Sequence, residues 1–221
     1  PSHVGELLDC PRRWFLSRRL GASGPMSAKA QAGSLVHRIA EENAEHWCLE
    51  RAMDQLDAEW TTLSFDYAWE SHVLLENCRE GLRRLDAWLV KSSQRELVGT
   101  EVPIKHVFDL PSAMVHVAGS IDRLERDEAG NHIVIDYKTG TKLPGKMNPH
   151  VIQVAIYQAA LAEGDENRRP VDVGPAELVY LMDEPHKRGK GATVKPVSPV
   201  EADPWPSGGD FTAVAGFHVK K

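Results

Sequence analysis

The sequence predicts an α/β fold, with one mixed central sheet and a helical extension in front of it. Two observations predict this class. Up to about residue 95 the apolar side chains recur at helical spacing, and after it come three short apolar and β-branched runs separated by turn residues. A helical pattern and one more apolar run follow, which gives the core order helix–three strands–helix–strand.

The helices of the front part are predicted from apolar residues that recur every three to four positions. Pro11 suits the first turn of one helix. A second helix is expected within residues 28–47, with one apolar face made by Leu35, Val36, Ile39 and Ala40. A third is expected around residues 70–91, and its apolar face would consist of Val73, Leu74, Cys78, Leu82, Leu85 and Leu89.

The strands are predicted where the period changes from helical spacing to runs of β-formers. They are expected at residues 96–108, 113–127 and 132–139, with "EAGN" as a tight turn before the third. A helix from about Asn148 to Gly164 follows, then a strand within 176–184. From Pro185 the chain is rich in Gly, Pro, Lys and Ser and reads as loop, with short strands at 192–197 and 212–219. We therefore divide the chain into a helical extension (1–95), a core (96–200) and a loop-rich tail (201–221).

The composition excludes several classes of protein. A net charge of −6 argues against a protein that coats nucleic acid by bulk electrostatics, although it permits an enzyme that holds a metal with acids. No apolar run approaches the ~20 residues of a membrane span, so no membrane partner is expected. The three scattered cysteines indicate a reducing, cytoplasmic setting without a disulfide framework. No phosphate-loop motif is present, so we expect no bound nucleotide.

The stretch "VIDYKTG" carries the chemistry. Residues two apart on a strand face the same way, so Asp136 and Lys138 point together while Ile135 and Tyr137 face the other side. Alone, such a pair is more often a plain ion pair. However, Asp122 lies near the end of the preceding strand, and the short turn predicts a hairpin that brings the two carboxylates together.

Two carboxylates on paired strands can converge on one divalent cation, and hard oxygen ligands suit Mg²⁺ or Mn²⁺. A bound metal polarises a phosphoryl oxygen and lowers the pKa of its water. The lysine can then orient that water, help to deprotonate it, or balance charge on the phosphate.

Three further polar residues accompany this pair. His37 follows Gly33 and Ser34 on a predicted amphipathic helix, where a lone histidine is ordinarily a packing or surface residue. Gln153 and Tyr157 stand four apart and so share one helix face. They reach a phosphate or a base in one interpretation, and are half-buried polar residues at a helix–sheet junction in the other.

The ordered set "CPRRWFL", "GSLVH", "GSIDRL", "IDYKTG" and "QVAIYQ" resembles the RecB-type nuclease branch of the PD-(D/E)xK superfamily, over most of the chain. The resemblance implies a restriction-endonuclease-like core. It also implies a metal site made by His37, Asp122, Asp136 and the backbone carbonyl of Tyr137, with Lys138 as the catalytic lysine beside the catalytic acids.

The same resemblance assigns Gln153 and Tyr157 to DNA handling, and we add the basic residues Arg12, Arg13 and Lys142 to that group. Glu101 resembles a family acid near the site and is a candidate for an outer metal shell. Some relatives carry an iron–sulfur cluster held by one early and three late cysteines. Cys10 matches the first, but no cysteine follows Cys78. We therefore predict no cluster, and expect Cys10 to be a small core residue.

The resemblance implies a Mg²⁺- or Mn²⁺-dependent deoxyribonuclease, exonucleolytic on single-stranded or unwound DNA ends, acting in double-strand-break repair and recombination. It further implies either a bacterial helicase–nuclease of the AddAB or AdnAB kind, with the helicase in cis or as a partner subunit, or a stand-alone bacterial exonuclease. The alternative is a catalytically silent module of the same fold that serves as a scaffold or DNA-binding surface. Silent copies usually lose acids or the lysine, whereas His37, Asp122, Asp136 and Lys138 are all present here.

Overall fold

A computed structural model describes residues 6–7, 10–22, 24, 26–110, 113–140, 149–164, 168–182 and 191–198. Lys142, the strand expected at 212–219 and the tail 201–221 lie outside these ranges. The division of the chain at residues 95 and 200 stays a prediction.

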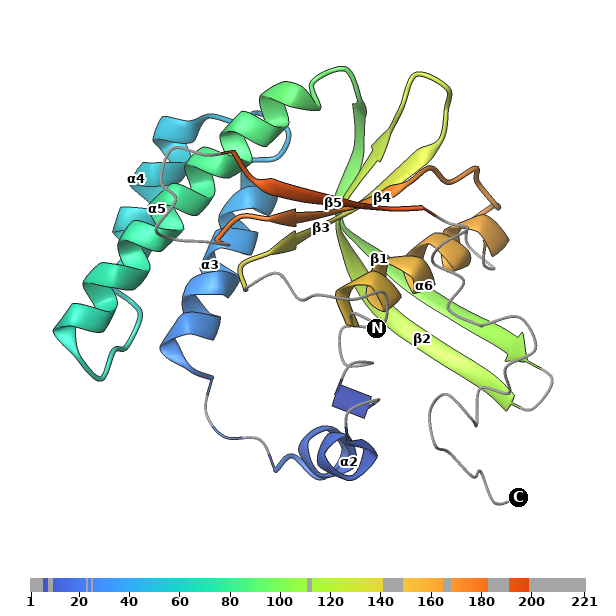
Figure 1. Cartoon of the computed structure of the whole chain (residues 1–221), viewed down its shortest axis with the longest axis horizontal. Coiled ribbons are helices and arrows are strands. Elements are labelled where there is room, and N and C mark those ends of the chain that lie inside the picture. The colour runs from blue at the N-terminus through green and yellow to red at the C-terminus, as the bar shows by residue number, and fades with distance from the viewer. Residues whose placement is uncertain are drawn as a thin grey trace.

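The described residues form one five-stranded mixed sheet (Figure 1). The first three strands make an antiparallel meander, the third and fourth are parallel, and the fifth is antiparallel to the fourth. A helix connects the parallel pair, as the sequence predicts. In chain order these elements are β1 (Glu96–Leu110), β2 (Ala113–Arg126), β3 (His132–Lys138), α6 (Pro149–Glu163), β4 (Ala176–Tyr180) and β5 (Thr193–Val197).

The turn residues of the core act where the sequence places them. The β2–β3 turn is closed by the Asp127 amide, which donates to the Asn131 carbonyl at 3.0 Å, and Gly130 takes a φ of +91° there. Helix α6 ends at Gly164, whose φ is +72° and whose amide donates to the Ala160 carbonyl at 3.0 Å. Glycine adopts a positive φ without steric cost. The chain can therefore reverse at Gly130, and α6 can end just before Gly164.

Four described helices precede the sheet: α2 (Pro11–Arg19), α3 (Ala28–Glu42), α4 (Leu49–Trp60) and α5 (Ala68–Lys91). The expected helix over 28–47 ends earlier, at Glu42, and α4 was not predicted. Its buried residues, Ala52, Leu56 and Trp60, recur every four positions, so the sequence did contain a helical signal for it. Val73 is exposed on α5, contrary to expectation, whereas Leu74 beside it is buried.

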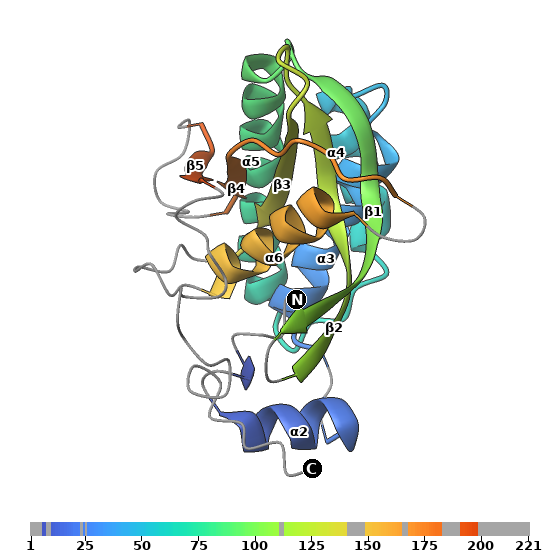
Figure 2. The same cartoon turned by 90° about the vertical axis from the view of Figure 1, so that its right-hand side faces the viewer.

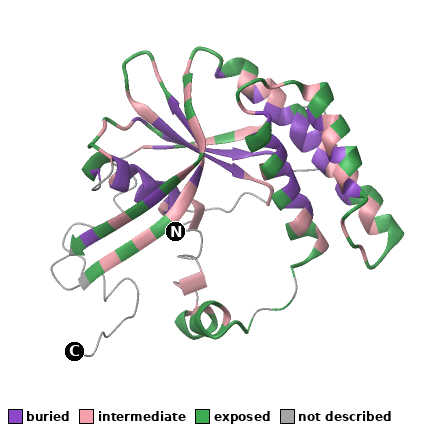
Figure 3. Ribbon diagram, turned by 180° about the vertical axis from the view of Figure 1, so that it is seen from behind, coloured by how far each residue is buried: buried purple, intermediate pink, exposed green. Residues whose placement is uncertain are grey.

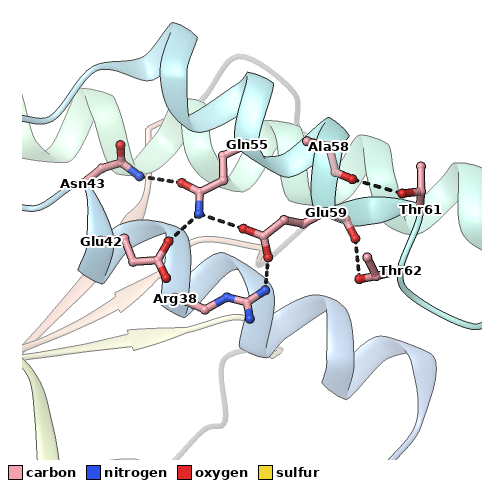
Figure 4. Close-up of polar contacts among 8 residues, drawn as sticks. All are labelled: Arg38, Glu42, Asn43, Gln55, Ala58, Glu59, Thr61 and Thr62. Carbon is pink, nitrogen blue, oxygen red and sulfur yellow. Dashed lines mark hydrogen bonds and ion pairs between the residues drawn. The ribbon is translucent and has the colours of Figure 1, made fainter.

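Polar side chains connect α3 to α4 (Figure 4). Gln55 on α4 accepts a hydrogen bond from the Asn43 amide at 2.9 Å and donates to Glu59 at 2.8 Å. Glu59 in turn pairs with Arg38 of α3. These contacts fix the two helices side by side at the outer layer of the molecule.

Two hydrophobic clusters cover the two faces of the sheet (Figure 2). Ile133, Ile135 and Tyr137 of β3 belong to the cluster with α3, α4 and α5, whereas Val134 belongs to the cluster with α6. Figure 3 shows the buried positions on the inner sides of α3 and α5 and along the central strands. The helical part therefore shares a core with the sheet, which brings α3 within reach of the end of β3.

No helix in the part of the chain described here has the length and apolar character that crossing a membrane requires.

Candidate active site

A cavity of about 390 Å³ lies where β3 ends, between α3 and the first turns of α6. Its lining comes from α3, β1, β2, β3 and α6, which are distant in sequence. The structure brings eight of the sequence-predicted site residues together here: His37, Glu101, Asp122, Asp136, Tyr137, Lys138, Gln153 and Tyr157.

Two predicted residues lie elsewhere. Arg12 and Arg13 are exposed on α2, which contributes no described residue to the cavity lining and lies apart from the sheet in Figures 1 and 2. Cys10 caps the start of α2 and is half-buried, so the expectation of a core cysteine is wrong. Helix α2 has no buried residue, so Cys10 does not adjoin a core there.

The two acidic residues meet because the β2–β3 ladder ends just before them. The last paired residues are Arg123 and Ile135, so Asp122 and Asp136 come next on their strands. There Asp122 Oδ2 accepts a hydrogen bond from the Tyr137 amide at 2.8 Å. A carboxylate takes the acceptor role that a main-chain carbonyl has in the ladder, which fixes Asp122 beside the end of β3.

Lys138 lies between an acid and an amide. Its Nζ is 2.5 Å from Asp136 Oδ2 and donates to Gln153 Oε1 at 3.0 Å. Asp136 and Lys138 therefore share one face of β3, as the alternation of the strand predicts. Gln153 on α6 is buried and anchors the ammonium group from the opposite wall of the cavity.

His37 reaches the cavity because α3 approaches the end of β3 closely at Gly33. A Cβ at Gly33 would lie 2.6 Å from Thr139 Oγ1, so only glycine permits this approach without a shift. One turn later, His37 Nδ1 lies 3.3 Å from Asp122 Oδ2. In "GSLVH", Gly33 allows the close contact with Thr139, and His37, four residues later, therefore lies beside Asp122.

The cavity concentrates negative charge out of water. Burial, and then the nearby Asp122 carboxylate, raise the pKa of Asp136 to about 7, although Lys138 and His37 oppose this. Burial lowers the pKa of His37, but the hydrogen bond and the charge of Asp122 outweigh it and leave that pKa raised. Burial also raises the pKa of Tyr157, to about 12, so its hydroxyl stays protonated and can donate.

The donor types in the cavity fit a hard divalent cation. The carboxylates of Asp122 and Asp136 and the imidazole of His37 all line the cavity. Asp136 Oδ2 is buried and makes an ion pair with Lys138, but it accepts no hydrogen bond. Among the described residues, however, no group of three or more His, Cys, Asp and Glu lies in metal-binding geometry. The imidazole of His37 instead contacts Asp122. Residues that could hold Mg²⁺ or Mn²⁺ are thus Asp122, Asp136 and His37.

Sequence reasoning missed His150, which also lines the cavity from α6. Its spacing from Gln153 and Tyr157, three and seven residues, places all three on one helix face and was the signal available. Burial, followed by the charge of Lys138, lowers the pKa of His150 to about 4, so its imidazole is neutral at pH 7. His150 Nδ1 lies 3.3 Å from the Tyr180 hydroxyl.

Glu101 occupies an unusual backbone conformation at the cavity. Its φ of +44° is the one positive value recorded for a described residue other than glycine. The Ser120 hydroxyl donates to Glu101 Oε2 at 2.5 Å. A left-handed conformation costs a non-glycine residue on the order of 1 kcal/mol, and strained residues of this kind cluster at functional sites.

The fold and the cavity define an α/β protein whose paired strands present two carboxylates and a lysine at one sheet end. Residues 1–208 match the family model of the PD-(D/E)XK nuclease superfamily, and the chain belongs to that superfamily. The crystal structure of SSO0001 is a distant likeness, with a TM-score of 0.36 and 16% identity over 96% of this chain and 82% of that one. No curated protein matches the chain.

Proposed function

We propose that this protein is a metal-dependent deoxyribonuclease that hydrolyses DNA phosphodiester bonds. The observation that carries the proposal is the meeting of Asp122, Asp136 and Lys138 in one cavity, in a chain of the PD-(D/E)XK nuclease superfamily. The presence of both acids and the lysine favours an active enzyme over a silent scaffold of the same fold.

Each residue has a part that follows from its contacts. Asp122, Asp136 and His37, with the Tyr137 carbonyl, would hold Mg²⁺ or Mn²⁺. When bound, such a cation polarises a phosphoryl oxygen and makes a nucleophile of water at neutral pH. Lys138 holds its ammonium group at the cavity, fixed by Gln153, where it orients the attacking water and balances charge on the phosphate.

We further propose that the substrate is an unpaired strand, attacked from an end. A second hollow, of about 590 Å³, adjoins the cavity along α3 and shares His37, Glu101 and Thr139 with it. A single strand would follow this groove with one phosphodiester at the carboxylates. Tyr157 and Gln153 would then contact the strand from α6.

The biological setting that we propose is a RecB-type helicase–nuclease of the bacterial cytoplasm that processes DNA ends in break repair and recombination. Its support is the order of five short motifs along the chain, from "CPRRWFL" to "QVAIYQ". A helicase, in cis or as a partner subunit, would supply unwound strands, since the sequence contains no phosphate-loop motif.

The decisive experiment is digestion of 5′-labelled single-stranded DNA, in linear and circular forms, with Mg²⁺, Mn²⁺ or EDTA. We expect cleavage of the linear form with either metal and none with EDTA. The Asp136→Ala and Lys138→Ala variants should lose at least ~10²-fold in rate, while Lys91→Met, which removes an exposed lysine, should retain full activity. Resistance of the circle would identify an exonuclease.

Two outcomes would contradict the proposal. If folded wild-type protein leaves both substrates intact with either metal, but binds them, the protein is the DNA-binding module of the alternative. If cleavage survives in both the Asp136→Ala and Lys138→Ala variants, the chemistry does not take place in this cavity.

A further inference from the structure

Tyr137 connects the cavity to the opposite face of the sheet. Its amide faces the cavity and donates to Asp122, whereas its side chain is buried, with 4% exposed, among the helices of the front part. The phenol ring packs edge-on against Trp88 of α5, with centroids 6.0 Å apart at 87°, and against His37 at 6.2 Å and 71°. Asp136 and Lys138 flank Tyr137 on β3, so the buried ring and both polar side chains share one short segment of main chain.

Charged side chains surround the phenol ring. Burial raises the pKa of the Tyr137 hydroxyl, and the charge of Arg123 on β2 opposes this rise. The Nε of Arg123 donates to Glu125 Oε1 at 2.6 Å, and Glu125 Oε2 lies 3.6 Å from Arg95 Nη1. We call the set Trp88, Arg95, Arg123, Glu125 and Glu177 the Tyr137 clamp.

Glu177 on β4 closes the clamp from the other side of β3. It accepts hydrogen bonds from Arg95 Nη2 at 2.6 Å and from the Trp88 indole at 3.1 Å. Trp88 in turn packs on Tyr137, so the series of contacts that starts at Arg123 ends at the phenol ring. The clamp joins β2 and β4, the two neighbours of β3, to α5, which runs across this face in Figure 1.

Stability alone does not account for this arrangement. Glu125 is 1% exposed and Arg123 8%, and Arg95 Nη1 and Glu125 Oε2 are buried without hydrogen bonds. Removing such charges from water costs several kcal/mol each, and apolar side chains of the same volume often stabilise a fold as well or better. Buried charges with fixed geometry do, however, specify one arrangement of the groups between them.

We propose that the Tyr137 clamp positions the catalytic strand for the nuclease reaction proposed above, on which this inference rests. None of the five clamp residues is among the residues that line the cavity, whereas Tyr137 is. The clamp residues act by holding the phenol ring in place. The ring in turn holds the main chain from Asp136 to Lys138, so that both side chains point into the cavity. The clamp residues are positioning residues.

The test compares Glu125→Gln with Glu80→Gln. The first removes the charge that faces two arginines of the clamp. The second breaks another buried ion pair, with Arg84 at 3.3 Å, on α5 but outside the clamp. Two quantities are measured well below the melting temperature of each variant: hydrogen exchange of the Tyr137 amide in metal-free protein, and kcat and KM for single-stranded DNA.

We expect Glu125→Gln to accelerate exchange of the Tyr137 amide roughly 10-fold and to lower kcat about 10- to 100-fold, with KM changed less than about 2-fold, since small misplacements of catalytic groups act on kcat. Glu80→Gln should lose similar stability without either effect. Trp88→Phe, which removes the indole donor to Glu177 and shrinks the ring that packs on Tyr137, should change both quantities in the same direction and serves if Glu125→Gln does not fold.

Unchanged exchange and kcat in Glu125→Gln, or equal changes in Glu80→Gln, would overturn the clamp as a positioning device. A wild-type protein without nuclease activity would refute the proposed function instead. The exchange of the Tyr137 amide would still decide whether the clamp holds the strand end.

Discussion

Replacing Asp136 with asparagine should stabilise the metal-free protein at high pH. The Asp136 carboxyl is 2% exposed and lies beside Asp122, and burial followed by that carboxylate raise its pKa from 3.8 to about 7. The unfolded chain releases this proton near pH 4. The folded chain retains it to about pH 7, so the folded state loses stability as the pH rises through this window.

The structure sets the size of the effect. A rise in pKa from 3.8 to about 7 corresponds to about 4 kcal/mol at pH 8, as an upper limit. Asp136→Asn removes this cost, but it also deprives Lys138 of its carboxylate partner. We therefore expect the variant to exceed wild type by about 1–3 kcal/mol in free energy of unfolding at pH 8, and by nothing at pH 4.

Urea unfolding in EDTA at pH 4, 6 and 8 measures this difference, with Asp54→Asn, an exposed acid on α4, as the matched control. A second series adds Mg²⁺ or Mn²⁺ at pH 8. The free energy of unfolding of wild type should rise with metal concentration, because the ion binds the folded state. Asp136→Asn should gain little, because the carboxylate needed for the cation is gone.

Equal or lower stability of Asp136→Asn at pH 8 in EDTA would refute this reasoning. It would mean that the Lys138 ion pair outweighs the desolvation of the carboxylate, so that the acid is a structural partner and not a site held ready for a cation. Metal stabilisation that persists in the variant would place the cation elsewhere.

Three further changes test other parts of the site and core. Gly33→Ala should cost about 1–3 kcal/mol in thermal unfolding and lower nuclease activity, because either Thr139 or α3 must shift at the end of β3. Gly24→Ala, with open space around it, should do neither. Gln153→Leu should lower kcat about 10-fold in the digestion of single-stranded DNA, since Lys138 loses the acceptor that fixes it. Leu82→Ala, fully buried on α5, should cost about 2–5 kcal/mol in urea unfolding yet leave kcat unchanged at low temperature.

The sequence alone predicted the elements whose signals are local. Strand alternation placed Asp136 and Lys138 on one face of β3, which the 2.5 Å contact confirms. The order of the core elements from β1 to β4, the turn at Gly130 and the end of α6 at Gly164 followed from periodicity and glycine chemistry. These features depend on side-chain direction and backbone conformation within a few residues, so the sequence contains their physical cause.

Only the tertiary structure decided which distant residues meet. The ladder ends at Arg123 and Ile135, which sets Asp122 beside the Tyr137 amide, and no local pattern specifies where two strands separate. The position of α3 depends on the core that it shares with β3 and on the approach at Gly33. The Tyr137 clamp likewise results from packing between distant elements, as in the contact of Trp88 with Glu177, which are 89 residues apart. The energies of these arrangements come from burial and charge summed over such contacts, which the spacing of residues along the chain does not contain.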